Sequence, residues 1–219
     1  MPALRVLVTR PREQARPLVE ALAAEGFDVV VEPLIAVEPL SGEPIDVRGY
    51  DCIIVTSANG ARELARRMSE KPSRIAAIGP GTVAALDEAG LRAEVVADVH
   101  TQEGLVDAFP ERPQRALFVG AEGARSFLAE ALDAEFLAVY RTVELSVDDL
   151  PPADLVTLMS PSAARAYARA GGRAPAITIG PQTTSAAKAA GIEVVAEARS
   201  QDVRGLVDSA AAWRASSRS

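Results

Sequence analysis

Short runs of apolar, mostly β-branched residues alternate along this chain with longer segments whose apolar residues recur every three to four positions. Runs of the first kind predict buried strands, and segments of the second kind predict amphipathic helices. The opening segment shows both: residues 5–9 and 28–31 are predicted strands, and Leu18 and Leu22 mark a helix between them that ends at Gly26. This alternation is typical of α/β proteins with parallel sheets and right-handed crossovers.

Much of the pattern occurs twice. Residues 78–82 (IGPGT) recur 101 positions later as residues 179–183 (IGPQT), and residues 104–107 (GLVD) recur at the same offset as residues 205–208. The order of segments is a, b, a′, b′, with extended stretches near residues 35–40 and 139–146. Duplication predicts two similar lobes, and ligands often bind between lobes. Repetition alone leaves open whether segment a shares a lobe with b or with b′.

Composition narrows the class of protein. The 219 residues are 48% hydrophobic and carry a net charge of −7, which argues against a nucleic-acid surface. The sequence contains neither a signal-peptide pattern nor an apolar stretch of membrane-spanning length, so we expect a cytoplasmic protein. A single cysteine, Cys52, and a single histidine, His100, exclude a cysteine-based zinc site and a His-rich metal site. Nucleotide-binding glycine motifs are also missing.

Four turns share one design, in which an apolar strand is followed by small polar residues and then by a helix. They contain Thr56 and Ser57, residues 79–82, Ser160 and Ser162, and residues 180–184. Such turns place helix N-termini at the carboxyl ends of strands, where backbone N–H groups and the helix dipole favour anions. For any single turn, the alternative is that the hydroxyls only cap helices. Four such turns in one duplicated chain favour an anionic ligand.

The chain resembles the uroporphyrinogen-III synthase family over nearly its whole length. The resemblance rests on the order and spacing of several modest motifs. They are LVTRP at residues 7–11, YDCIIVTSANGAREL at 50–64, the two Ile-Gly-Pro-x-Thr turns, VYRTVEL at 139–145 and TLMSPSAARAY at 157–167.

The resemblance implies an α/β fold with two similar lobes, each a parallel sheet flanked by helices, joined by a two-stranded β linker. One lobe is discontinuous in sequence: lobe one is expected to comprise residues 1–34 plus 147–219, and lobe two residues 41–138. The linker strands are then residues 35–40 and 139–146. Family members are cofactor-free monomers, so no cofactor and no metal are expected.

The implied activity is cyclisation of hydroxymethylbilane to uroporphyrinogen III, with inversion of ring D and loss of water, in tetrapyrrole biosynthesis. A transient contact with the upstream hydroxymethylbilane synthase is the implied protein partner; no nucleic acid and no membrane are expected. One alternative is a non-catalytic module of the same fold that binds a tetrapyrrole or another polyanion. Another is a generic two-lobe binder of sugars or phosphates.

The resemblance also implies roles for particular residues. Tyr140 matches the tyrosine proposed to assist departure of the substrate hydroxyl, and its alternative role is packing beside the linker. Arg10 is a candidate carboxylate clamp or else a surface charge. The remaining expected substrate-binding residues lie in the four turns: Thr56, Ser57, Thr82, Ser160, Ser162 and Thr183.

Two features depart from the family pattern. The segment from Glu130 to Leu145 has 16 residues, whereas its counterpart from Glu20 to Leu40 has 21, so lobe two is predicted to lack an edge strand. Gly81 and Val119 also stand where basic residues are common in the family, which would weaken charge-based binding by lobe two.

Overall fold

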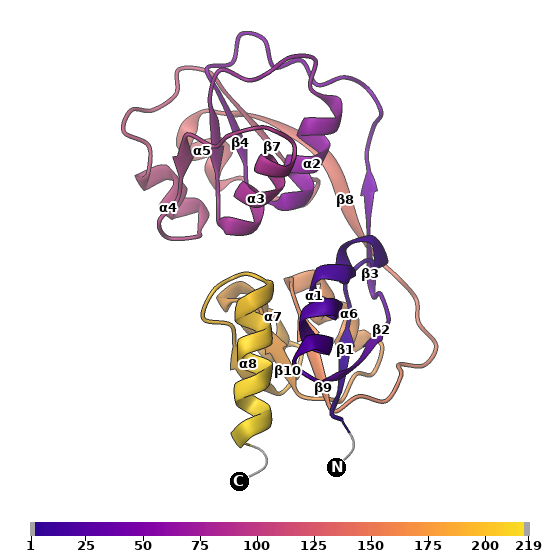
Figure 1. Cartoon of the computed structure of the whole chain (residues 1–219). Helices are drawn as coiled ribbons and strands as arrows, with labels where there is room; N and C mark the ends of the chain where they lie inside the picture. Colours follow the sequence, from indigo (N-terminus) through magenta and orange to yellow (C-terminus); the bar gives the residue numbers. More distant parts are fainter. Residues whose placement is uncertain (1–2, 217–219) are drawn as a thin grey trace. The chain divides into compact units, whose positions relative to one another are not determined.

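The computed structural model describes residues 3–216, and the chain divides into two compact units. Unit 1 combines residues 1–36 with 142–219, and unit 2 comprises residues 37–141. Figure 1 shows that each unit contains its own sheet with helices packed against it. The predicted α/β class, with mostly parallel sheets flanked by helices, is confirmed.

Unit 1 is built on a five-stranded parallel sheet in the order β11-β10-β9-β1-β2. Its three inner strands are buried because both faces of the sheet are covered by helices. The strands are β1 (Arg5–Val8), β2 (Asp28–Val31), β9 (Leu155–Leu158), β10 (Ala176–Thr178) and β11 (Val194–Glu197).

Two helix pairs cover the two faces of this sheet. Helix α1 (Arg12–Ala24) packs beside α8 (Val203–Ser216), and α6 (Pro161–Arg169) packs beside α7 (Pro181–Ala189). Each pair has its own apolar cluster, one formed around Leu18 and Leu206 and the other around Tyr167. The sheet is therefore the middle of three layers, and its carboxyl edge is where α6 and α7 begin.

Unit 2 repeats this three-layer plan with a six-stranded sheet in the order β3-β8-β7-β4-β5-β6. Helices α2 and α3 pack together in one apolar cluster, and α4 and α5 in another. The strands are β3 (Ile35–Pro39), β4 (Cys52–Val55), β5 (Ile75–Ala77), β6 (Val95–Val96), β7 (Ala116–Ala121) and β8 (Glu135–Glu144); the helices are α2 (Ala58–Arg67), α3 (Pro80–Glu88), α4 (Gln102–Asp107) and α5 (Phe127–Leu132).

The prediction that this half lacks a strand is wrong. In the first copy of the repeat, β2 and β3 are separate strands, whereas in the second copy the ten-residue β8 takes the place of both. The sheet of unit 2 therefore keeps a strand beside β7, as the sheet of unit 1 keeps β2 beside β1. Strand β8 starts two residues after Asp133, whose left-handed conformation (φ 49°) ends α5, and it pairs in parallel with β7 from Glu135 onward. The shorter spacing thus removes the loop between strand and linker and retains the strand.

The repeated Gly-Leu-Val-Asp motif has a steric cause. Thr101 caps α4 by accepting a hydrogen bond from the Gly104 N–H, and Asp202 caps α8 by accepting one from the Gly205 N–H. A Cβ atom on Gly104 would lie 2.2 Å from the Val99 carbonyl oxygen. A Cβ atom on Gly205 would lie 2.2 Å from the corresponding carbonyl oxygen of Ser200. Both helices can therefore begin so close to the preceding loop only with glycine at this position.

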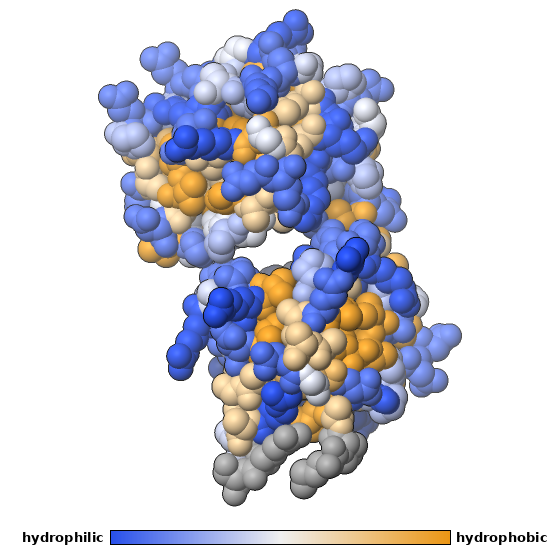
Figure 2. All heavy atoms as spheres, viewed as in Figure 1, coloured by the Kyte–Doolittle hydropathy of each residue, from blue (hydrophilic) through white to orange (hydrophobic). Residues whose placement is uncertain are grey.

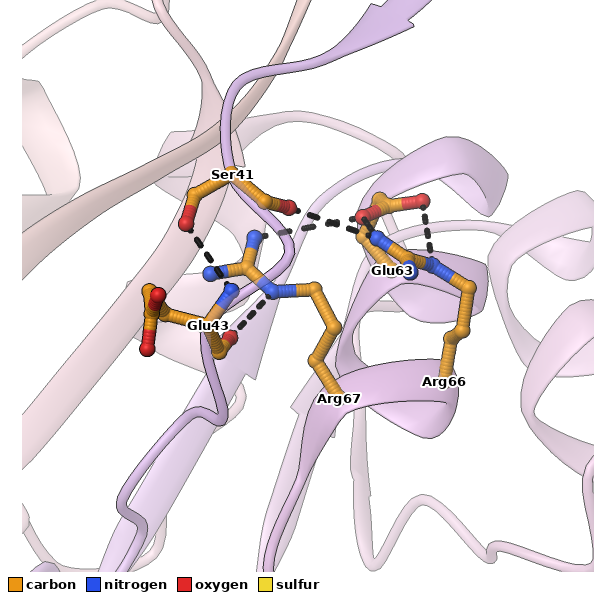
Figure 3. Close-up of polar contacts among 5 residues, drawn as sticks. All are labelled: Ser41, Glu43, Glu63, Arg66 and Arg67. Atoms are coloured by element: carbon orange, nitrogen blue, oxygen red, sulfur yellow. Dashed lines mark hydrogen bonds and ion pairs between the residues drawn. The ribbon is translucent and has the colours of Figure 1, made fainter.

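The C-terminal end of α2 anchors the segment that follows β3 (Figure 3). The buried Arg67 donates a hydrogen bond from Nε to the Glu43 carbonyl oxygen at 2.7 Å, and its own carbonyl accepts one from the Ile45 N–H at 2.8 Å. Arg67 Nη1 lies 3.9 Å from Glu63, and the same carboxylate binds the exposed Arg66 at 2.7 Å. The segment is thus held both by backbone hydrogen bonds and by the buried Arg67 guanidinium.

We expect Arg67→Met to lower the free energy of unfolding by about 2 kcal/mol, because it keeps the aliphatic volume but removes a buried charge-assisted hydrogen bond. Arg66→Met is the matched control, since its side chain is 51% exposed and surface ion pairs contribute less than about 1 kcal/mol. Urea unfolding followed by circular dichroism measures both changes. Equal losses in the two variants would contradict the anchoring role of Arg67.

Candidate functional site

The turn after β4 forms the first part of the candidate site in unit 2. Ser57 has extended backbone angles and is the N-cap of α2, where its Oγ accepts a hydrogen bond from the Gly60 N–H at 3.0 Å. Thr56, directly before it, is half-buried at the end of the strand. Both expected residues therefore lie at the carboxyl edge of the sheet, beside the positive end of the α2 dipole.

Tyr140 is brought to Ser57 by the order of the strands. It lies on β8 opposite Ala121 at the end of β7, and β7 is the neighbour of β4. The phenol oxygen is 2.9 Å from Ser57 Oγ, and the Tyr140 side chain is buried, with 6% exposure. Burial raises the pKa of Tyr140 above its ordinary value, and the hydrogen bond with Ser57 opposes that rise. The phenol is therefore protonated at neutral pH and able to donate a proton.

The second turn of unit 2 opens α3, as predicted. Gly79 adopts the left-handed conformation (φ 72°) that glycine favours, and Pro80 takes the first helical position. Thr82 is 4% exposed, and its N–H donates to the Gly79 carbonyl oxygen. The Thr82 side chain thus belongs to the interior of unit 2, so the surface of this turn is formed largely by main chain and by Gly81.

Unit 1 carries a matching set at the ends of three neighbouring strands, β10, β9 and β1. Ser160 is the N-cap of α6, and its Oγ accepts from the Ala163 N–H at 3.1 Å and bonds Ser162 Oγ at 3.0 Å. Arg10 follows β1, is half-buried, and donates to Gln14 Oε1 at 3.3 Å. Sequence reasoning thus located two hydroxyls and one guanidinium along one edge of this sheet.

The fourth turn opens α7 at Gly180, with Pro181 in the first helical position. Thr183 is 2% exposed, so its side chain, like that of Thr82, is interior. The neighbouring Thr184 hydroxyl bonds the Thr178 hydroxyl and donates to the Glu197 carboxylate. This turn is therefore fixed to the ends of β10 and β11 by a hydroxyl that the sequence had not distinguished from Thr183.

Sequence reasoning missed two side chains that lie over these turns. One is the half-buried His100: its Cγ lies 3.7 Å from the position that a Cβ atom on Gly79 would take. Gln201 Cδ lies 3.0 Å from the corresponding point on Gly180. The signal was available, because the offset of 101 that relates Gly79 to Gly180 also relates His100 to Gln201. Because His100 and Gln201 differ in type, identical residues alone do not reveal this part of the repeat.

The chain carries a net charge of −7, so its overall electrostatic field does not attract anions. Figure 2 shows hydrophilic residues interspersed with hydrophobic patches on the visible face of each unit. Within residues 3–216, no cluster of three or more His, Cys, Asp or Glu side chains could hold a metal ion. In the same part of the chain, no helix is both long and apolar enough to cross a membrane. The groups of these turns that could hold an anion are the helix N-termini, the hydroxyls and Arg10.

Comparison with known proteins places these features in one family. The family model for uroporphyrinogen-III synthase HemD matches residues 16–208. A uroporphyrinogen-III synthase of Synechococcus elongatus is 28% identical over 59% of this chain and 55% of its own length. One from Chlorobaculum parvum is 29% identical over 67% of this chain and 64% of its own length. The matches thus span less than two thirds of these relatives.

A solved structure agrees with the fold. A mutant uroporphyrinogen III synthase from Thermus thermophilus superposes with a TM-score of 0.62, at 17% identity, covering 99% of this chain and 100% of that one. This similarity concerns the fold, whereas the family model rests on the sequence. Because that model matches 193 of the 219 residues (208 − 16 + 1), the chain belongs to the uroporphyrinogen-III synthase family.

Proposed function

We propose that this protein is a uroporphyrinogen-III synthase, which cyclises hydroxymethylbilane to uroporphyrinogen III with inversion of ring D and loss of water. One observation carries the proposal: a buried, protonated phenol, Tyr140, is held at the N-terminus of α2 in a chain of this family. A phenol in that setting can donate a proton to a departing hydroxyl.

The proposed reaction needs one proton donor and firm control of substrate geometry. Tyr140 gives its proton to the terminal hydroxyl, water leaves, and an azafulvene remains. The last pyrrole then attacks through its substituted carbon, and the resulting spiro intermediate fragments and recloses with ring D inverted. Ring closure releases the proton of the attacking pyrrole carbon. This proton offsets the one given to the hydroxyl and can return to Tyr140. The reaction steps involve no oxidation or reduction. The main contribution of the protein is therefore to position the substrate.

Binding of the substrate follows from the chemistry of the turns. The acetate and propionate groups of hydroxymethylbilane are anionic, and the protein is acidic overall. We therefore assign carboxylate binding to local donors: Arg10, the hydroxyls of Thr56, Ser160 and Ser162, and the main chain of the turns. Thr82 and Thr183 contribute through their turns, because their side chains are buried.

The test is isomer analysis. Incubation with freshly made hydroxymethylbilane, followed by oxidation and separation of isomers, is expected to give isomer III in excess of isomer I, which forms by unassisted ring closure. Isomer I alone would contradict the proposal. Saturable binding without isomer III would instead indicate a non-catalytic tetrapyrrole-binding module. Since uncatalysed ring closure competes throughout, a protein-free reaction run in parallel supplies the baseline.

A further inference from the structure

The Ser57 hydroxyl is shared between two partners. Its Oγ accepts the Gly60 N–H at 3.0 Å and lies 2.9 Å from the Tyr140 phenol oxygen. A serine hydroxyl has one proton and two acceptor lone pairs, and the amide uses one of those lone pairs. The proton of Ser57 therefore remains available for the bond with Tyr140.

The direction of that bond is fixed once Tyr140 has lost its proton. A neutral phenol can donate to Ser57 or accept from it, so at rest either direction satisfies both oxygens. A phenolate can only accept, and then Ser57 must be the donor. Hydrogen bonds to a charged oxygen are roughly twice as strong as neutral ones. The bond thus strengthens as the proton leaves Tyr140.

The surroundings hold both oxygens in place for this change. Ser57 is fixed by its capping bond, and Tyr140 is held by the pairing of β8 with β7. The start of α2 packs closely against β7, because a Cβ atom on Gly60 would lie 3.3 Å from the Val119 carbonyl oxygen. The positive end of the α2 dipole also favours negative charge at this point.

We propose that Ser57 is a positioning residue that stabilises the Tyr140 phenolate formed when Tyr140 donates its proton, a role distinct from binding substrate carboxylates. The inference rests on the proposed function, in which Tyr140 is the proton donor. The inference gives Ser57 and Ser160, which cap α2 and α6 in the duplicated turns, different roles. The Ser160 hydroxyl bonds the Ser162 hydroxyl, whereas the Ser57 hydroxyl bonds a tyrosine.

Three substitutions of Ser57 separate capping from proton donation. Ser57→Ala removes both, Ser57→Asp keeps a capping acceptor without a donor, and Ser57→Thr keeps both. We expect kcat to fall about 10- to 100-fold in Ser57→Ala and at least as far in Ser57→Asp, with near-normal turnover in Ser57→Thr. Thr101→Ala is the control, because Thr101 caps α4 of the same unit through a bond of the same length, 3.0 Å. It is expected to lose stability but retain turnover.

A titration tests the same bond without activity. With a fluorotyrosine at position 140, whose phenol is more acidic than tyrosine, phenolate absorbance reports the pKa directly. Removal of the donor is expected to raise that pKa by about one to two units in Ser57→Ala and further in Ser57→Asp, but not in Ser57→Thr. An unchanged pKa in Ser57→Ala would overturn the inference, as would full turnover in that variant. If the wild-type protein makes no isomer III, the proposed function fails, while the titration still decides whether Ser57 supports the phenolate.

Discussion

Replacement of Tyr140 by Phe is expected to lower kcat for isomer III formation by about 100-fold, the lower end of what a general acid contributes. The phenyl ring keeps the packing of this buried side chain, so the loss would come from the missing proton. The proton moves only in the transition state, and KM should therefore change little. Steady-state assays with isomer separation measure both constants.

Tyr167→Phe provides the matched control. Tyr167 is also buried, and its hydroxyl donates to the Ala174 carbonyl oxygen at 3.1 Å, away from the turns of the candidate site. This change is expected to reduce stability and leave kcat intact. If Tyr140→Phe turned over at the wild-type rate, the Tyr140 hydroxyl would be structural, and another proton donor would have to be sought.

The pKa of Tyr140 also determines how kcat is expected to change with pH. Because burial raises this pKa, the acid form persists through neutral pH and is lost only as pH rises past the raised value. Deprotonation of Tyr140 should therefore limit kcat on the alkaline side alone. In Tyr140→Phe, the residual activity should lack that alkaline decline.

The second large effect concerns the repeated glycines. Gly104→Ala and Gly205→Ala are each expected to lower the free energy of unfolding by about 3 kcal/mol, since the new Cβ atom would lie 2.2 Å from a backbone carbonyl oxygen. Relief requires a shift of main chain, which is costly in a packed unit. Gly81→Ala, with no heavy atom within 4 Å of the new Cβ, is expected to be neutral or stabilising by up to about 1 kcal/mol.

Urea unfolding can assign each loss to its unit. The single tryptophan, Trp213, lies on α8, so its fluorescence follows unit 1, and circular dichroism follows both units. Gly205→Ala should shift the fluorescence transition, and Gly104→Ala should shift a part of the circular dichroism signal that fluorescence does not report. The steric account would be wrong if either variant unfolded at the same urea concentration as Gly81→Ala.

Local signals were sufficient to predict most of the fold. The strand before Thr56 and the turns of small residues that precede α3 and α6 are features of neighbouring residues, and these predicted elements formed near their expected places. The strand order could not be predicted in this way, because it depends on which distant segments pair. The 2.9 Å bond between Ser57 and Tyr140, 83 positions apart, follows from that order.

The burial of individual side chains was the other feature that the sequence could not predict. The sequence placed Thr82 and Thr183 in the right turns but could not show that both would face the interior, because a helix start presents inner and outer positions one residue apart. The same ambiguity hid Thr184, which anchors the fourth turn. The predicted missing strand failed for a related reason, because residue spacing measures chain length and does not show which loop was shortened.

The two glycines also show what the two halves of the fold have in common. Gly104 and Gly205 meet the same steric demand in both copies, since in each a Cβ atom would lie 2.2 Å from the carbonyl oxygen of the residue five positions earlier. Tyr140 has no such counterpart, since the first linker strand, residues 35–40, contains no tyrosine. The two halves thus share the same backbone framework, whereas the proposed proton donor belongs to only one of them.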